Sequence, residues 1–276
     1  MKFKSFLLIF SCFFFVSFMV EKAKNDLQRA NLKGSVKSAT WYTYKGVIKM
    51  GLPEKDSLQL KSISEFDSKG NKTVESSYKA DGSLIYKWTY THDEHGNETS
   101  YTAENKRGIT TTKYSYKLDS TGKVSEMYIF KSDGSLVSKN RRKYDDKGNE
   151  IESDSYDNSG PQGAKSTFVY DDKGNLTVST NYNSSGVIEV RTIFSSYDAN
   201  GSFNEETFKS PIFNYHHLYK HDDKGNMTEM KVLNKDGSVV DFTYQYEYDK
   251  MGNWTKKIVY NNDKLQSILE QEIQYY

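Results

Sequence analysis

The sequence predicts an all-β protein: a continuous antiparallel meander of about 16–18 strands, built from 26-residue double-hairpin repeats and forming a twisted or curled open sheet. Three observations support this prediction. A turn motif recurs at nearly constant spacing, the segments between turns alternate aromatic and polar residues, and no segment beyond the apolar N-terminus has a long helical period. The 22 tyrosines, 15 phenylalanines and only 3 prolines suit strands whose half-buried faces are made of amphipathic aromatics.

The repeated turn is the motif Asp-x-x-Gly, written YDDKGN at Tyr144–Asn149 and again at Tyr170–Asn175. It occurs eight times, and its glycines are separated by 26, 26, 26, 26, 27, 24 and 27 residues. The aspartate can accept hydrogen bonds from backbone N–H groups ahead of it, and the glycine supplies the positive φ of a bulged hairpin turn. We assign a structural turn role to eight pairs: Asp67 with Gly70, Asp93 with Gly96, Asp119 with Gly122, Asp145 with Gly148, Asp171 with Gly174, Asp198 with Gly201, Asp222 with Gly225 and Asp249 with Gly252.

A second series of glycines divides these units. Its members each lie 12 residues after a glycine of the first series: Gly82, Gly108, Gly134, Gly160, Gly186 and Gly237. Each unit thus holds two turns, which predicts two strands per unit.

The segments between turns alternate as strands do. In Tyr86–His92, written YKWTYTH, the aromatic residues take every second position, and Phe242–Tyr248, written FTYQYEY, repeats the pattern. About sixteen strands are expected after the first turn, and two more near Ser35–Tyr44 and Ser57–Phe66. A short helix is compatible only with Lys22–Leu32. The residues six positions before each first-series glycine are predicted to share one face: Ser64, Tyr90, Tyr116, Arg142, Phe168, Ser195, Tyr219 and Tyr246.

The N-terminal segment is typical of an export signal. Lys2 and Lys4 precede the apolar run Phe6–Val20, which is shorter than the about 20 residues that a membrane-spanning helix needs. We predict a signal peptide over 1–23, a lead-in with the first strand over 24–56 and a β-repeat domain over 57–276. Two alternatives stay open: an uncleaved membrane anchor, or lipid attachment to Cys12, the only cysteine.

The YDDKGN turns, each followed 12 residues later by a second glycine, resemble the YD repeats, also called RHS repeats, of exported bacterial wall-associated and toxin proteins. The resemblance covers Ser57 to Tyr276 and implies a long β-sheet that spirals into a hollow shell. Two departures favour an open, curved sheet. The spacing is longer than in the usual YD unit, and the repeats continue to EQEIQYY with no toxin domain after them. MORN-type hairpin repeats are a more distant resemblance, since their Tyr-x-Gly signature is missing.

The composition and motifs exclude several kinds of site. The 38 Lys and Arg nearly balance the 37 Asp and Glu, so no nucleic-acid partner is predicted. No nucleophile elbow, phosphate loop or His-Glu-x-x-His motif occurs, and we predict no catalytic residue, no cofactor and no metal site. The candidate ligand-stacking residues are Trp88, Tyr90, Tyr114, Tyr116, Tyr244 and Tyr246, for which packing into a core is the favoured alternative.

These features predict an exported, non-enzymatic bacterial protein that is periplasmic, on the outer surface or secreted. It would act as a cell-envelope scaffold or as a binding module for a glycan or an envelope protein. It would meet a membrane only through an uncleaved N-terminal segment or a lipidated Cys12. The alternatives are an envelope polysaccharide hydrolase and an accessory or remnant of an RHS-type toxin-delivery system. Exposed first and last strands would also permit edge-to-edge assembly.

Overall fold

The computed structural model describes residues 25–276, apart from 158–159, 200 and 213; the predicted signal peptide lies outside the described residues. One short helix, α1 (Asp26–Arg29), precedes a single antiparallel sheet of 18 strands. The strands are β1 (Val36–Lys49), β2 (Leu52–Phe66), β3 (Lys72–Lys79), β4 (Leu84–His92), β5 (Glu98–Asn105), β6 (Gly108–Leu118), β7 (Val124–Lys131), β8 (Leu136–Tyr144), β9 (Glu150–Asp157), β10 (Gly160–Tyr170), β11 (Leu176–Tyr182), β12 (Ile188–Tyr197), β13 (Phe203–Lys209), β14 (Asn214–His221), β15 (Met227–Leu233), β16 (Val239–Tyr248), β17 (Trp254–Asn261) and β18 (Lys264–Tyr275).

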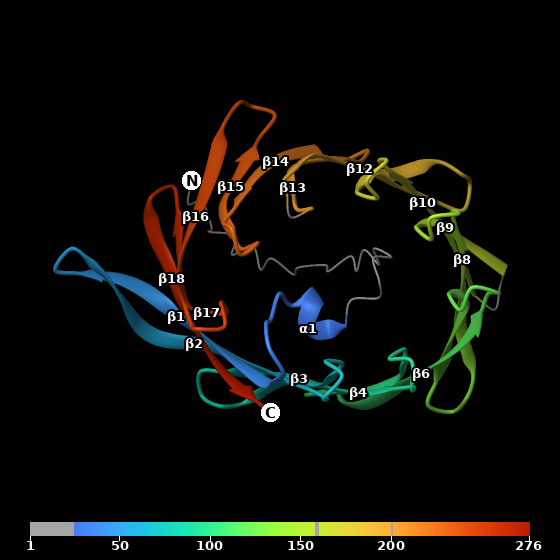
Figure 1. Ribbon diagram of the computed structural model, residues 1–276, viewed down its shortest axis with the longest axis horizontal. Helices are drawn as coiled ribbons and strands as arrows, with labels where there is room; N and C mark the ends of the chain where they lie inside the picture. Colours follow the sequence, from blue (N-terminus) through green and yellow to red (C-terminus); the bar gives the residue numbers. More distant parts are fainter. Residues whose placement is uncertain (1–24, 158–159, 200, 213) are drawn as a thin grey trace, which may run out of the picture.

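The sheet closes into a barrel (Figure 1). Each strand pairs with the next along the chain, and β1 also pairs with β18, so that Ala39 lies opposite Ser64 on one side and Ile273 on the other. The all-β class is confirmed, but the predicted open, twisted or curled sheet is wrong. Closure pairs the first strand with the last, so the open edge expected between them is absent from the described residues; only the tip of the β1–β2 hairpin extends past its neighbours.

The first-series turns have the predicted geometry. All eight of their glycines have φ between 79° and 89°. Each of the eight aspartates accepts a hydrogen bond from the backbone N–H four residues later. In the turn of Asp171, Oδ1 accepts from the N–H groups of Lys173 and Asn175, and Oδ2 accepts from the side-chain amide of Asn175 at 2.8 Å. These carboxylates are therefore occupied by their own turns.

Tyrosine hydroxyls form hydrogen bonds between successive units on the inner face of the barrel. Tyr144 donates to the carbonyl of Val124 at 2.8 Å, and Tyr170 donates to the carbonyl of Glu150 at 2.9 Å. In both cases the acceptor lies two residues after the glycine of the preceding unit. The same bond is made by three further pairs: Tyr116 to Glu98, Tyr197 to Leu176 and Tyr246 to Met227.

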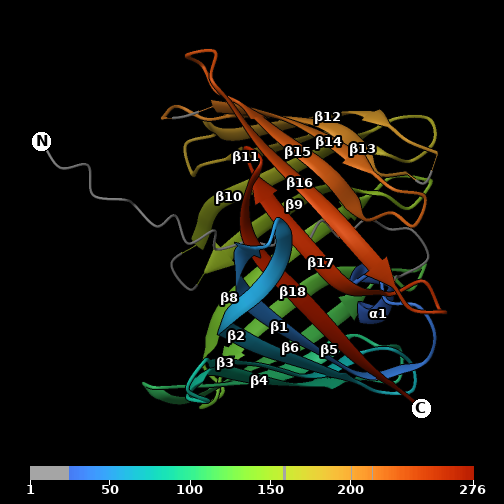
Figure 2. The same cartoon turned by 90° about the vertical axis from the view of Figure 1, so that its left-hand side faces the viewer.

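The N-terminal plug, residues 25–34, lies inside the ring at the end that holds the first-series turns (Figures 1 and 2). Asn25 caps α1 in a capping box with Gln28, and its side chain donates to the carbonyl of Lys69 at 2.7 Å. The main buried cluster surrounds the plug and consists of Leu27, Leu32, Val36, Ala39 and Phe66, with Trp41 and Ile273 packed against it. The core therefore fills one part of the barrel, next to β1 and β2.

One face of the sheet lines the lumen. Ala39 and Phe66 on this face pack around α1, and α1 lies inside the ring (Figure 1). Because partners in an antiparallel pair share a face, the strand register extends this assignment around the barrel. The prediction that Ser195 shares this face is wrong. Ser196, with φ of 59°, adds one residue to β12, so Ser195 lies opposite Glu205 on the outer face and Phe194 takes the lumen position.

The β1–β2 hairpin extends beyond its neighbours and lies in front of β18 in Figure 2. Pairing of β1 with β18 ends at Lys45, and pairing of β2 with β3 begins at Leu60. The ion pair between Lys55 and Glu270, at 2.8 Å, anchors the hairpin to the barrel wall. Among the described residues, no helix is both long enough and apolar enough to cross a membrane.

Candidate functional site

Six aromatic side chains from three consecutive strands form a continuous patch on the lumen wall. We call this the β4–β6 patch; it consists of Tyr86, Trp88 and Tyr90 from β4, Tyr101 from β5, and Tyr114 and Tyr116 from β6. Neighbouring ring centroids are 5.2–6.5 Å apart. The patch joins four residues singled out from the sequence, Trp88, Tyr90, Tyr114 and Tyr116, and adds two that were missed.

The two missed residues differ in how visible they are in the sequence. Tyr86 belongs to the same alternation as Trp88, so the strand pattern alone could have included it. Tyr101 becomes a neighbour of Tyr90 only because the register of β4 and β5 places the two opposite each other. Register across a turn with a bulge is not visible in the period of one strand.

The central ring of the β4–β6 patch is exposed, and the other five residues are half-buried. Trp88 is 39% exposed, and none of the six patch residues belongs to the buried cluster around α1. A barrel of about 16–18 strands encloses a channel that side chains do not fill. Trp88 therefore presents apolar surface to the lumen, where a ligand could cover it.

Hydroxyl groups border these rings. Tyr86 donates to Glu75 Oε1 at 3.1 Å, and Tyr116 donates to the carbonyl of Glu98. Burial, with the nearby charge of Glu75, raises the pKa of Tyr86 to about 12. Burial, with the nearby charge of Glu98, likewise raises the pKa of Tyr116 to about 12. Both hydroxyls therefore remain protonated at neutral pH, so the patch combines apolar ring faces with neutral polar groups.

A group of ionisable side chains connects the patch to the plug. Asp26 of α1 accepts a 2.7 Å hydrogen bond from the backbone N–H of Lys72 and lies 4.0 Å from Nε2 of His92. Burial, and secondarily the charge of Asp26, raises the pKa of Glu98 to about 7. Glu98 also raises the pKa of Tyr114, after the larger effect of burial. A partly protonated carboxyl group therefore lies beside the aromatic wall.

A second aromatic group lines the lumen on β13 and β14. The rings of Phe208, Tyr215 and His217 are stacked, with centroids 4.6 Å and 4.1 Å apart. Tyr219 donates to Glu206 Oε2 at 2.6 Å and lies 3.0 Å from Nδ1 of His217. Nothing in the sequence indicated this ring stack, since Phe208 comes from the neighbouring strand.

The last two predicted stacking residues, Tyr244 and Tyr246, lie on β16 and not in the β4–β6 patch. They share their part of the lumen wall with Lys257 of β17, which lies opposite Tyr246. Between β16 and β4 the wall continues through β17, β18, β1, β2 and β3. The six predicted residues thus belong to two separate places in the lumen.

The outer face of the barrel carries ladders of ion pairs. Glu126 is paired with Lys117 at 3.1 Å, Lys139 at 2.7 Å and Arg141 at 3.2 Å. These four residues come from β6, β7 and β8 and alternate with the lumen-facing positions. Further outer-face pairs join Glu152 to Lys143 and Lys165, Glu229 to Lys220 and Lys231, and Glu247 to Lys256.

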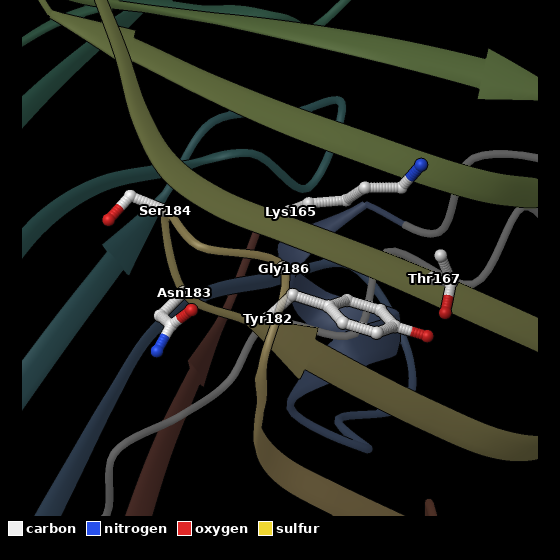
Figure 3. Close-up of a pocket in the computed structure, with 6 residues that line it drawn as sticks. All are labelled: Lys165, Thr167, Tyr182, Asn183, Ser184 and Gly186. Carbon is white, nitrogen blue, oxygen red and sulfur yellow. The ribbon is translucent and has the colours of Figure 1, made fainter.

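A pocket of about 490 Å³ opens on the outer face beside the turn between β11 and β12. Figure 3 shows Lys165 and Thr167 on one strand, next to Tyr182 and the turn residues Asn183, Ser184 and Gly186. The ammonium of Lys165 is already paired with Glu152 at 2.7 Å. The pocket is lined by one aromatic ring, that of Tyr182, whereas six rings meet in the lumen, and we place the candidate site at the β4–β6 patch.

No protein family model matches the chain, and no curated protein matches it. Among solved structures, a porin-like protein from Bacteroides uniformis ATCC 8492 is similar over 88% of this chain and 98% of its own, with 12% identity and a TM-score of 0.45. A porin-like protein from Bacteroides vulgatus ATCC 8482 covers 88% of this chain and 99% of its own, with 10% identity and a TM-score of 0.29.

A third similar structure is the TcdB2-TccC3-Cdc42 complex, with 14% identity and a TM-score of 0.36. The likeness covers 89% of this chain but only 16% of the matched chain. Identities and TM-scores this low assign neither a family nor a function, and the resemblance to YD repeats stays a prediction.

Proposed function

We propose that this chain is an exported, non-enzymatic binding protein that holds a carbohydrate chain in the lumen of its barrel. The β4–β6 patch is the main support for this function. Sugar rings have apolar C–H faces and polar edges, and a ligand of this kind would match exposed aromatic faces bordered by protonated hydroxyls. Trp88 is the central residue, because its ring neighbours Tyr86, Tyr90 and Tyr101.

The proposal places water on both sides of the barrel wall. Barrels that span an outer membrane present an apolar band about 25 Å tall to lipid, and an outward charge at mid-membrane costs about 2–4 kcal/mol. The ion pairs around Glu126 and Glu229 instead place charged side chains on the outer face of the barrel, where a lipid-facing wall would be apolar. We therefore favour a binding barrel in an aqueous compartment over a membrane channel.

Export is supported by the sequence alone, through Lys2, Lys4 and the apolar run Phe6–Val20. Expression of the full chain followed by cell fractionation tests this part of the proposal. We expect the chain to be recovered outside the cytoplasm. We also expect it to be released into the aqueous phase after the N-terminal segment is processed. Retention of the processed barrel in detergent-soluble membranes would argue for a lipid-facing wall.

Calorimetric titration with neutral β-linked oligosaccharides tests binding. We expect Trp88→Ala to weaken binding about tenfold, because a central aromatic side chain dominates such contacts. Tyr128→Ala is the matched control, since Tyr128 is an aromatic residue of the outer face next to Phe130. Equal affinities for the wild type and Trp88→Ala would contradict the assignment of the site, and shorter products after prolonged incubation would contradict a non-enzymatic role.

A further inference from the structure

Lys257 is a lumen-facing cation held among aromatic rings. Its ammonium lies 4.4 Å from the ring centroid of Tyr244 and 5.6 Å from that of Tyr246. The ring of Trp254 lies 6.5 Å from that of Tyr246, and the residues opposite Lys257 and Tyr244 on the neighbouring strands include Leu269 and Val259. The surroundings of this ammonium are thus aromatic and aliphatic.

Two half-buried cations on the lumen face have a carboxylate partner that Lys257 lacks. Lys72 pairs with Glu75 at 2.5 Å, and Arg142 lies 3.7 Å from Glu150. In the part of the chain that the structure describes, the ammonium of Lys257 has only the two ring contacts. Burial lowers the pKa of Lys257, because removal from water disfavours the charged ammonium.

Folding thus leaves an uncompensated positive charge that a ligand can neutralise. An anionic group placed against this ammonium would gain a charge-assisted hydrogen bond, and the flanking rings would contact the face of the sugar that bears it. A neutral sugar would gain only the ring contacts. The charge on Lys257 therefore distinguishes acidic from neutral ligands.

We propose that Lys257, Tyr244 and Tyr246 form a lumen subsite for an anionic sugar, whose charge comes from a carboxylate or a sulfate ester. This inference rests on the proposed function and names its substrate class. The β4–β6 patch contacts any sugar of suitable shape, whereas the Lys257 subsite selects the acidic residue of the chain.

The test compares three ligands on the full chain by calorimetric titration. They are oligogalacturonate, its methyl ester, and an oligosaccharide of the same length that has no carboxylate and carries sulfate esters. The carboxylate of the first is masked in the second, so these two differ in charge and little in shape. We expect the wild type to bind one of the two acidic ligands about tenfold more tightly than the methyl ester, as a hydrogen bond to a charged group implies. Which acidic ligand binds more tightly identifies the source of the charge.

Lys257→Met should abolish that preference, so that the acidic ligands bind no more tightly than the methyl ester. Lys257→Arg keeps the positive charge and should therefore retain the preference for acidic ligands. Lys256→Met is the matched control, because Lys256 is the next residue but lies on the outer face, paired with Glu247 at 2.8 Å. A circular dichroism melt verifies that each variant is folded.

The outcomes separate this subsite from the general function. If the wild type binds acidic and esterified ligands equally, or if Lys257→Met keeps the preference, the subsite is overturned while carbohydrate binding stands. If no ligand binds, both proposals fail. About tenfold weaker binding of every ligand in Trp88→Ala, with loss of only the acidic preference in Lys257→Met, supports both.

Discussion

Asp26 and Lys72 join the N-terminal plug to the barrel wall: Oδ2 of Asp26 accepts a 2.7 Å hydrogen bond from the backbone N–H of Lys72. The same plug contacts the turn between β14 and β15, where the side chain of Asn31 donates to the carbonyl of Lys224 at 3.2 Å. It also contacts the turn between β16 and β17, where the N–H of Lys33 donates to Asn253 Oδ1 at 2.8 Å. Residues 25–34 therefore hold separate parts of the ring together.

Replacing Asp26 tests the contribution of this connection. Asp26→Ala leaves the N–H of Lys72 without its acceptor, so we expect the free energy of unfolding to fall by about 1–2 kcal/mol. Urea denaturation measures the loss. Asp56→Ala, at an exposed position of the projecting β1–β2 hairpin, is the control and should change stability little. Similar losses in the two variants would show that the plug does not stabilise the barrel.

Glu98 makes stability depend on pH. Its pKa rises from 4.5 in the unfolded chain to about 7 in the folded protein, so the folded state binds the proton more tightly. The stabilisation is complete below pH 4.5 and is lost as pH rises through about 7. Because the group is partly exposed, we expect the lost stabilisation to be about 1–2 kcal/mol, less than the full shift implies.

Unfolding measured across this pH range should show the effect in the wild type and not in Glu98→Gln, which cannot ionise. Glu104→Gln, on an exposed outward position of the same strand, is the control and should keep the wild-type profile. A profile for Glu98→Gln that matches the wild type would assign the pH dependence to another group.

Tyr170 tests the hydroxyl bonds between units. Tyr170→Phe removes the donor to the carbonyl of Glu150 and keeps the ring, so we expect a loss of about 1 kcal/mol in unfolding free energy. Tyr182→Phe removes a hydroxyl from the outer-face pocket instead and should cost less. Thermal unfolding of both variants decides the matter, and a larger loss in Tyr182→Phe would contradict a stabilising role for these bonds.

Gly70 and Gly82 separate backbone strain from contact with the plug. Both have positive φ, 84° and 80°, so an alanine at either position strains the turn by about 1–2 kcal/mol. At Gly82 a Cβ atom meets nothing within 4 Å, whereas at Gly70 it would overlap the side chain of Asn25 and lie 3.1 Å from Cδ1 of Leu27. Gly70→Ala should therefore lower the melting temperature more than Gly82→Ala. Equal effects would mean that the plug moves aside without cost.

The local features of the fold could be predicted from the sequence because they depend on nearby residues. Asp171 and Gly174 fix a turn through bonds within four residues, so the motif alone reveals it. The shared face of Trp88 and Tyr90 follows from the period of two along one strand. The alternation failed at Ser195, because a single residue with positive φ, Ser196, shifts the phase without any glycine to mark it.

The candidate site was only partly predictable, because some of its contacts join residues of different strands. Trp88 and Tyr90 were visible as alternating aromatics, but their contact with Tyr101 depends on register across a bulged hairpin. Lys257 had no signal in the sequence, since a lysine in a strand is ordinarily solvated. Its significance depends on the rings beside it and on the absence of a carboxylate among its described neighbours.

The sequence by itself determined the all-β class, the order of the strands and the position of nearly every turn, because aspartate–glycine turns are stabilised by contacts within a few residues. Only the tertiary structure decided that the sheet closes, that the plug occupies one end and that the aromatic face lines a lumen. Closure joins Ala39 to Ile273, and it depends on the twist summed over all 18 strands. No short segment contains that sum, so no motif could reveal it.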